Sequence, residues 1–168
     1  ICGLSDRECV EVSVEYGADY LGFNFFEPSP RYVKAHVVAD ITEGVPESVA
    51  KVGVFVDPDD DLLDHVLGLV RLDYIQLHGG EAPERIDQVR FNYGVPVIKA
   101  IGVSTANDVR SIESFTNHAD RFLFDAKAPP NADRPGGNAV AFNWPLMQNY
   151  VGSLPWFLAG GLAADTVA

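Results

Sequence analysis

Short apolar runs recur along the chain, and most are followed by a polar or glycine-containing turn and then a segment with helical spacing. Runs this short and this continuously apolar are typical of strands buried on both faces of a parallel sheet. The pattern predicts seven strands, at residues 1–2, 20–25, 51–56, 74–77, 96–101, 121–124 and 156–159. Between them it predicts helices at residues 5–16, 35–43, 57–69, 81–93, 104–117 and 142–150, with another beginning at Ala163.

Capping signals support two of the helix boundaries. Ser5 with Glu8 three residues later fits a capping box, and Ser104 is placed to cap a later helix. In the first helix, Cys9 stands at helical spacing from two further apolar residues. Such a stripe faces the core in most surface helices, so Cys9 is predicted to be buried.

Strands that alternate with helices predict an α/β fold with a parallel sheet. A doubly wound sheet fits the alternation too, but no glycine-rich dinucleotide fingerprint follows the first strand. Polar groups follow many successive strands, which favours a (β/α)8 TIM barrel with its site at the strands' carboxyl ends. Seven of its eight units are represented. We therefore expect a single barrel domain over residues 1–168, truncated at both ends, with strand 8 and its helix missing.

Charge and composition narrow the range of partners. The chain has 24 acidic and 12 basic residues and a formal net charge of −12, which argues against nucleic acid or anionic membrane as partners. The two cysteines, Cys2 and Cys9, form neither a disulfide framework nor a zinc pattern, and this favours a reducing cytoplasm. No apolar stretch approaches the roughly 18 residues of a membrane span.

Chemically useful groups stand where the predicted strands end. In a closed barrel these groups would converge on one mouth. They are Cys2, Asn24 with the loop that carries Arg31, Asp57, His78, Lys99, Asp125, and the pair Gly160 and Gly161.

Asp125 follows the apolar run at residues 122–124, and two interpretations of it stay open. It is either a loop cap or ion-pair partner, or a carboxyl whose pKa is raised by apolar neighbours so that it donates a proton. Cys2 likewise is either a small core residue or a thiolate base or nucleophile that needs a lowered pKa.

The remaining candidates have structural alternatives as well. Arg31 directly follows Pro30 in a loop made rigid by two prolines, where it is either a solvated charge or a clamp for a carboxylate. His78 can simply bond the next loop, and Lys99 can pair with a neighbouring acid. Gly160 and Gly161 precede a predicted helix after strand 7, which is the usual place for a phosphate in this fold.

These strand ends belong to an ordered series of motifs that covers the whole chain. The series resembles the phosphoribosylanthranilate isomerase family of tryptophan biosynthesis. Its motifs are Ile1-Cys2-Gly3-Leu4, Gly22-Phe23, Ser29-Pro30-Arg31, Val52-Gly53-Val54-Phe55-Val56, Gln76-Leu77-His78-Gly79, Lys99-Ala100-Ile101, Phe124-Asp125, Pro135-Gly136-Gly137, Phe142 with Trp144, and Leu158-Ala159-Gly160-Gly161-Leu162.

The resemblance implies the Amadori rearrangement of N-(5-phosphoribosyl)anthranilate to 1-(2-carboxyphenylamino)-1-deoxyribulose 5-phosphate, without metal or cofactor. It implies a cytoplasmic enzyme, monomeric or homodimeric, alone or fused to or associated with another tryptophan-pathway enzyme. The implied roles are Cys2 as general base, Asp125 as general acid, Arg31 as ligand of the anthranilate carboxylate, Gly160 and Gly161 as phosphate ligands, and His78 and Lys99 as further substrate-binding groups at the barrel mouth.

The sequence departs from the family's motifs at some positions, and alternative functions remain open. Ala139 stands where the family has Gly, and Asn143 where Asp is common, while the phosphate loop of strand 8 is absent. The sister Amadori isomerase of histidine biosynthesis, or a dual-specificity barrel, would carry a carboxylate where this chain has Cys2. A non-catalytic phosphosugar-binding barrel is disfavoured by the joint presence of Cys2, Arg31 and Asp125.

Overall fold

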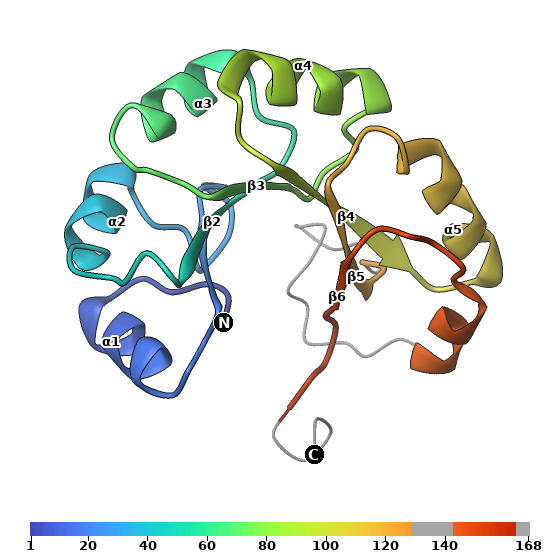
Figure 1. Cartoon of the computed structure of the whole chain (residues 1–168), viewed down its shortest axis with the longest axis horizontal. Helices are drawn as coiled ribbons and strands as arrows, with labels where there is room; N and C mark the ends of the chain where they lie inside the picture. Colours follow the sequence, from blue (N-terminus) through green and yellow to red (C-terminus); the bar gives the residue numbers. More distant parts are fainter. Residues whose placement is uncertain (129–142, 164–168) are drawn as a thin grey trace. The chain divides into compact units, whose positions relative to one another are not determined.

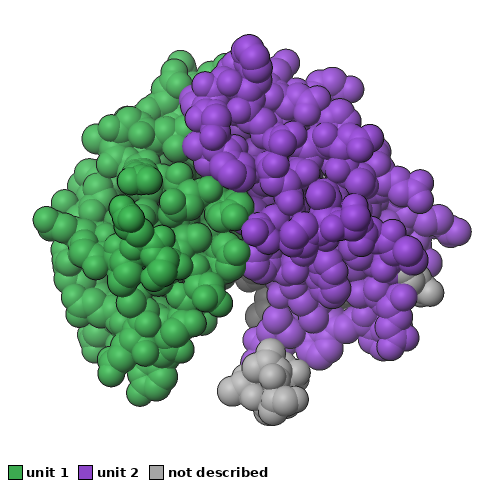
Figure 2. Space-filling model, in the orientation of Figure 1, with its two compact units in different colours: residues 1–76 green, residues 77–168 purple. Residues whose placement is uncertain are grey.

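The computed structural model describes residues 1–128 and 143–163. The chain forms two compact units, residues 1–76 and residues 77–168 (Figure 2). In each unit the helices lie along one face of the strands (Figure 1). None of the helices in the described ranges is long and apolar enough to cross a membrane.

Unit 1 contains three strands in chain order, β1 (Tyr20–Asn24), β2 (Ala50–Phe55) and β3 (Tyr74–Leu77), the last of which ends in unit 2. Its helices are α1 (Arg7–Glu15), α2 (Ala35–Ile41) and α3 (Asp60–Leu67). β1 and β2 are parallel, with Tyr20 opposite Ala50 and Asn24 opposite Val54. Before α1, the predicted first strand is a single parallel bridge between Cys2 and Gly22.

Unit 2 has the sheet order β4 (Val97–Val103), β5 (Arg121–Ala126) and β6 (Trp156–Leu158), all parallel. Gly102 lies opposite Asp125, and Phe124 lies opposite Leu158. Its helical segments are α4 (Pro83–Tyr93), α5 (Ala106–Ser111), and the 3-10 helices η1 (Ile112–Phe115) and η2 (Trp144–Asn149).

The parallel α/β architecture predicted from the pattern of apolar runs is confirmed, and each predicted strand after the first is found within two residues of its expected bounds. Near-continuous burial along β2 and β4 fits strands that are covered on both faces. The helix predicted from Ala163 onward falls almost wholly outside the described residues.

The start of α1 differs from its prediction in two ways. Asp6, not Ser5, is the N-cap, because its carboxylate accepts the Cys9 N–H at 2.8 Å. The prediction that Cys9 is buried is wrong: its side chain is exposed, and the helix buries Val10 instead. A separate hydrogen bond between the Cys9 side chain and Asp6, together with the negative charge of Asp6, raises the pKa of the Cys9 thiol.

The α5 segment also begins one residue later than predicted. Thr105 rather than Ser104 is the N-cap, and Asp108 completes a capping box by accepting the Thr105 N–H at 2.8 Å. The predicted single helix over residues 104–117 is instead a short α-helix followed by the tighter η1, and the segment predicted at residues 142–150 is the 3-10 helix η2.

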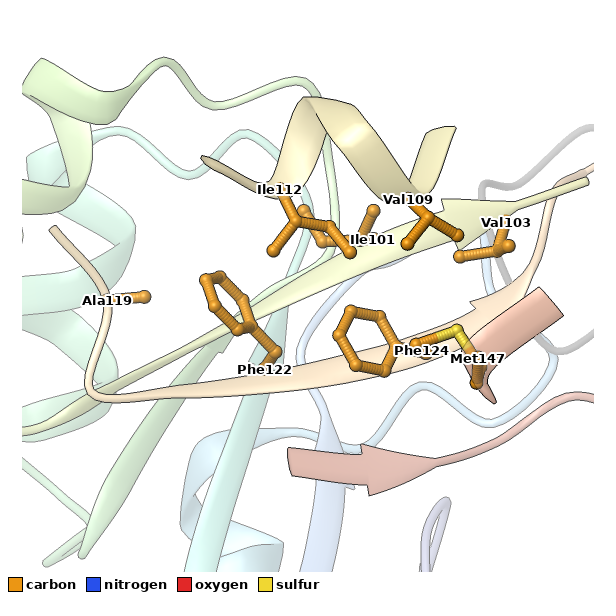
Figure 3. Packing of buried hydrophobic residues seen from close by; sticks show 8 residues of the cluster. All are labelled: Ile101, Val103, Val109, Ile112, Ala119, Phe122, Phe124 and Met147. Carbon is orange, nitrogen blue, oxygen red and sulfur yellow. The ribbon is translucent and has the colours of Figure 1, made fainter. Parts of the chain in front are cut away.

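The core of unit 2 fills the space between the sheet and α5, and we call it the α5 core (Figure 3). Phe122 and Phe124 of β5 are both 0% exposed and stack with ring centroids 6.0 Å apart. Side chains alternate along a strand, so Leu123 and Asp125 point to the other face. The members of the α5 core are Ile101, Val103, Val109, Ile112, Ala119, Phe122, Phe124 and Met147.

This alternation corrects one expectation. The phenylalanines of the 122–124 run were expected to surround the Asp125 carboxyl, yet they lie on the opposite face of β5 and pack under α5 (Figure 3). The surroundings of Asp125 must therefore come from other segments.

Truncating Phe124 should destabilise the protein strongly. Its ring contacts Phe122, Tyr150 and Trp156, with centroids 6.0, 5.1 and 5.4 Å away. We expect Phe124→Ala to lower the free energy of unfolding by about 3–5 kcal/mol, because the lost burial leaves a cavity. Urea unfolding measures this. Phe91→Ala on α4 is the matched control, since Phe91 is 91% exposed, and a similar loss in both variants would contradict the prediction.

Candidate active site

Asp125 is buried near the carboxyl end of β5, with 7% of its surface exposed. Its Oδ1 accepts the N–H of Ala126 at 2.8 Å, and its Oδ2 lies 3.4 Å from Nε2 of His78. His78 directly follows β3. Two residues predicted for the site are thus brought together, and contacts at both oxygens hold the carboxyl in one orientation.

Gly160, two residues after β6, approaches Asp125 closely. A Cβ at Gly160 would lie 2.8 Å from the Ala126 nitrogen and 3.1 Å from Asp125 Oδ1, and its φ of +82° is one that L side chains rarely adopt. The indole Nε1 of Trp144 donates to the Gly160 carbonyl at 3.3 Å. Only glycine fits here, and the predicted phosphate turn of Gly160 and Gly161 therefore adjoins the predicted acid.

In unit 1, the turn that carries Arg31 is held by polar side chains. Asn24, at the end of β1, accepts the Phe26 N–H at 2.9 Å and donates through Nδ2 to Ser29 Oγ at 3.2 Å. The buried Ser29 Oγ also accepts the Arg31 N–H at 3.2 Å. These bonds fix the backbone of the turn, so the position of Arg31 is set by Asn24 and Ser29.

Arg31 packs against Gly3, the residue that follows Cys2 in the chain. The Gly3 backbone has a φ of +84°, and a Cβ there would lie 2.5 Å from Arg31 Cδ. The exposed Cys2 thiol lies over Gly22, where an added Cβ would be 3.0 Å from its Sγ. The absence of side chains at Gly3 and Gly22 thus leaves room for the guanidinium stem and the thiol.

Lys99 belongs neither to the group around Asp125 nor to the group formed by Cys2 and Arg31. It shares the helix-facing side of β4 with Ile101 and is 3% exposed. Its ammonium group donates to Glu81 Oε2 at 2.8 Å, to the Gly79 carbonyl at 2.8 Å and to the Leu77 carbonyl at 3.3 Å. The alternative predicted for Lys99, a pair with a neighbouring acid, is confirmed, and all three donors are engaged within the protein.

Two buried polar residues, one in each unit, were not predicted from the sequence. Glu81 is 5% exposed and was counted only as a helix start, although a carboxylate directly after a glycine pair was a signal. Ser29 lies between two prolines, and nothing in the sequence signalled that its hydroxyl would hold the turn. The predicted motif at residues 135–137, Ala139 and Phe142 lie outside the described residues, and Asn143 is exposed.

The whole chain matches the model of a known enzyme family. The family model described as N-(5'-phosphoribosyl)anthranilate (PRA) isomerase matches residues 1–168. The chain belongs to this family. The resemblance seen in the ordered motifs is confirmed, and with it the function of a PRA isomerase in tryptophan biosynthesis.

Relatives in this family are similar over the whole chain. The PRA isomerase of Paramagnetospirillum magneticum is 51% identical over 168 residues, which cover 100% of this chain and 78% of the relative. That of Rhodospirillum rubrum is 46% identical over 172 residues, covering 100% and 79%.

Solved structures of PRA isomerases share the fold. The Thermotoga maritima isomerase has a TM-score of 0.86 and 33% identity, over 99% of this chain and 78% of that one. A PRA isomerase in complex with reduced 1-(o-carboxyphenylamino)-1-deoxyribulose 5-phosphate has a TM-score of 0.80 and 31% identity, over 96% and 74%.

Proposed function

We propose that the intact protein catalyses the Amadori rearrangement of N-(5-phosphoribosyl)anthranilate with Asp125 as general acid and Cys2 as general base. The observation that carries this proposal is the buried Asp125 carboxyl, fixed by Ala126 and His78 at the end of a strand. A buried carboxyl in one orientation suits proton delivery to a single atom of a bound substrate.

The reaction needs one proton given and one proton taken. Asp125 donates a proton to the ribose ring oxygen, the bond from that oxygen to C1′ breaks, and the anthranilate nitrogen supplies the electron pair that forms an iminium. The iminium acidifies the C2′ proton, which the Cys2 thiolate removes, and the released electron pair gives an enolamine. Tautomerisation of the enolamine yields the aminodeoxyribulose, so no atom is gained or lost overall.

The two charged ends of the substrate have separate ligands in this proposal. Arg31, on its braced turn, binds the anthranilate carboxylate through a two-pronged hydrogen bond. Gly160 and Gly161 present backbone N–H groups to the phosphate, and their positive φ values of +82° and +70° are ones that side chains would disfavour. The acidic chain, with net charge −12, binds this anion only through such local groups.

We further propose that residues 1–168 form seven of the eight units of one (β/α)8 barrel in the intact protein. Its relatives support this, because the chain covers 78% and 79% of the two relatives described above. The second half of the phosphate site would come from the eighth unit. Cytoplasmic location and a monomeric or homodimeric state belong to the same proposal, and one T. maritima relative is described as dimeric.

The direct test is turnover of phosphoribosylanthranilate by the purified full-length protein, followed through the fluorescence of the anthranilate group. Wild type should convert the substrate without any added metal or cofactor. A folded wild-type protein that leaves the substrate unchanged would contradict the proposed function.

Replacing Arg31 should weaken substrate binding. We expect Arg31→Ala to raise KM by about 10- to 100-fold, since a charge-assisted hydrogen bond contributes about 1.5–3 kcal/mol. Steady-state kinetics measures this, with binding checked directly because KM reports affinity only when chemistry is slow. Arg71→Ala, which removes an exposed arginine in the same unit, is the control and should leave KM unchanged. An unchanged KM for Arg31→Ala excludes the clamp.

A further inference from the structure

Lys99 and Glu81 form an ion pair that is almost completely buried. Their side chains are 3% and 1% exposed, and Nζ lies 2.8 Å from Oε2. Removing two charges from water is costly, and an apolar pair of the same volume often stabilises a protein as well or better. Stability alone therefore gives a weak reason for this pair, and its other contacts indicate what else it does.

The pair forms hydrogen bonds with the backbone on both sides of His78. Lys99 donates to the Leu77 carbonyl at 3.3 Å and to the Gly79 carbonyl at 2.8 Å, and these are the residues before and after His78. Both carboxylate oxygens of Glu81 accept the Gly79 N–H at 3.0 Å. The His78 backbone is thus fixed by one ammonium and one carboxylate.

His78 in turn touches the predicted acid. Its Nε2 lies 3.4 Å from Asp125 Oδ2, while its own side chain is 15% exposed. Lys99 stays on the helix-facing side of β4 beside Phe115, whose ring centroid is 5.9 Å from its Nζ. Asp125 points to the other face of the sheet. Within the described residues, the turn that carries His78 connects the pair to Asp125.

We propose that Lys99 and Glu81 are positioning residues, which hold His78 against Asp125 and so keep the acid aimed at the substrate. This proposal rests on the proposed function of Asp125. It assigns neither residue a contact with substrate.

A double-mutant cycle in the full-length protein tests it. Lys99→Met combined with Glu81→Gln removes the charges but keeps an acceptor for the Gly79 N–H. We expect a fall in kcat of about 10- to 100-fold, as is typical of a small misplacement of a catalytic group, with a smaller change in KM. His78→Gln should lose a similar factor, and the triple variant should lose no more than His78→Gln alone.

Matched controls separate positioning from stability. Arg90→Met combined with Asp120→Asn removes an ion pair of 2.8 Å elsewhere in unit 2, and it should lower stability while leaving kcat unchanged. Lys99→Gln combined with Glu81→Gln is the second variant if the first lowers the yield of folded protein, because it keeps an amide at both positions and leaves no buried charge unpaired. Its loss in kcat should again disappear in the His78→Gln background. The proposal is overturned if the triple variant loses the product of the two separate factors in kcat. It is also overturned if the paired change at Lys99 and Glu81 leaves kcat unchanged.

A readout without turnover completes the test. In nitrogen-15 spectra, Asp125→Asn should shift the ring resonances of His78 in the otherwise wild-type protein, because the two groups touch. In the Lys99→Met/Glu81→Gln background this response should be lost, and a response that persists unchanged overturns the proposal. An inactive wild-type protein with an intact response would instead refute only the proposed function.

Discussion

We expect Asp125→Asn to slow turnover of phosphoribosylanthranilate by about 10²- to 10⁴-fold, the range typical for loss of a general acid. The amide keeps an acceptor for the Ala126 N–H that Asp125 Oδ1 now accepts at 2.8 Å, so the fold at the end of β5 should survive. It has no proton of suitable acidity for the ring oxygen. The loss should therefore appear in kcat, with the substrate still bound.

The control for Asp125 is another aspartate that is held by a histidine. Asp87 Oδ2 lies 2.8 Å from Nδ1 of His118, but its side chain is 52% exposed and lies on α4. Asp87→Asn should leave kcat unchanged. Single-turnover kinetics and urea unfolding of both variants separate a chemical defect from a folding defect, and a near wild-type kcat in Asp125→Asn would exclude the assignment.

Cys2→Ala should cause a loss of the same order, about 10²- to 10⁴-fold in kcat, because no base then removes the C2′ proton. The substitution removes only a sulfur from an exposed position next to Gly22, so little change in stability is expected. Steady-state kinetics with phosphoribosylanthranilate measures the effect.

The chain supplies its own control for Cys2. Cys9 is also exposed, and its thiol has a raised pKa because of the hydrogen bond with Asp6. Cys9→Ala should keep full activity. Iodoacetamide should inactivate the Cys9→Ala variant in step with alkylation of Cys2, as followed by mass spectrometry. Activity that outlasts complete alkylation of Cys2 would remove it from the mechanism.

Strand positions were predictable from the sequence because a strand in a parallel sheet is apolar on both faces and short, a pattern that depends on neighbouring residues alone. β3, for example, was predicted at its observed bounds. The motif series was equally readable, since each motif is a short stretch of chain. That Cys2 takes a proton and Asp125 gives one stays a prediction until the variants are measured.

Other features depend on contacts between distant segments, and these the sequence does not reveal. Helical spacing placed Cys9 in the core, but only Val10 of α1 is buried in the folded unit. The position of Lys99 in a strand could be predicted from the neighbouring residues. Its hydrogen-bond partners could not, because they lie 18 to 22 positions earlier in the chain. The predicted enclosure of Asp125 by phenylalanines failed because proximity in sequence was taken for proximity in space, although alternate residues of a strand face opposite ways.

The alternation along β5 has a consequence for how this protein can change. Phe122 and Phe124 belong to the α5 core, whereas Asp125 occupies the other face. Substitutions at positions 122 and 124 should therefore act mainly on stability, whereas position 125 carries the proposed general acid. One six-residue strand thus places the α5 core and the proposed acid on opposite faces, at alternate positions.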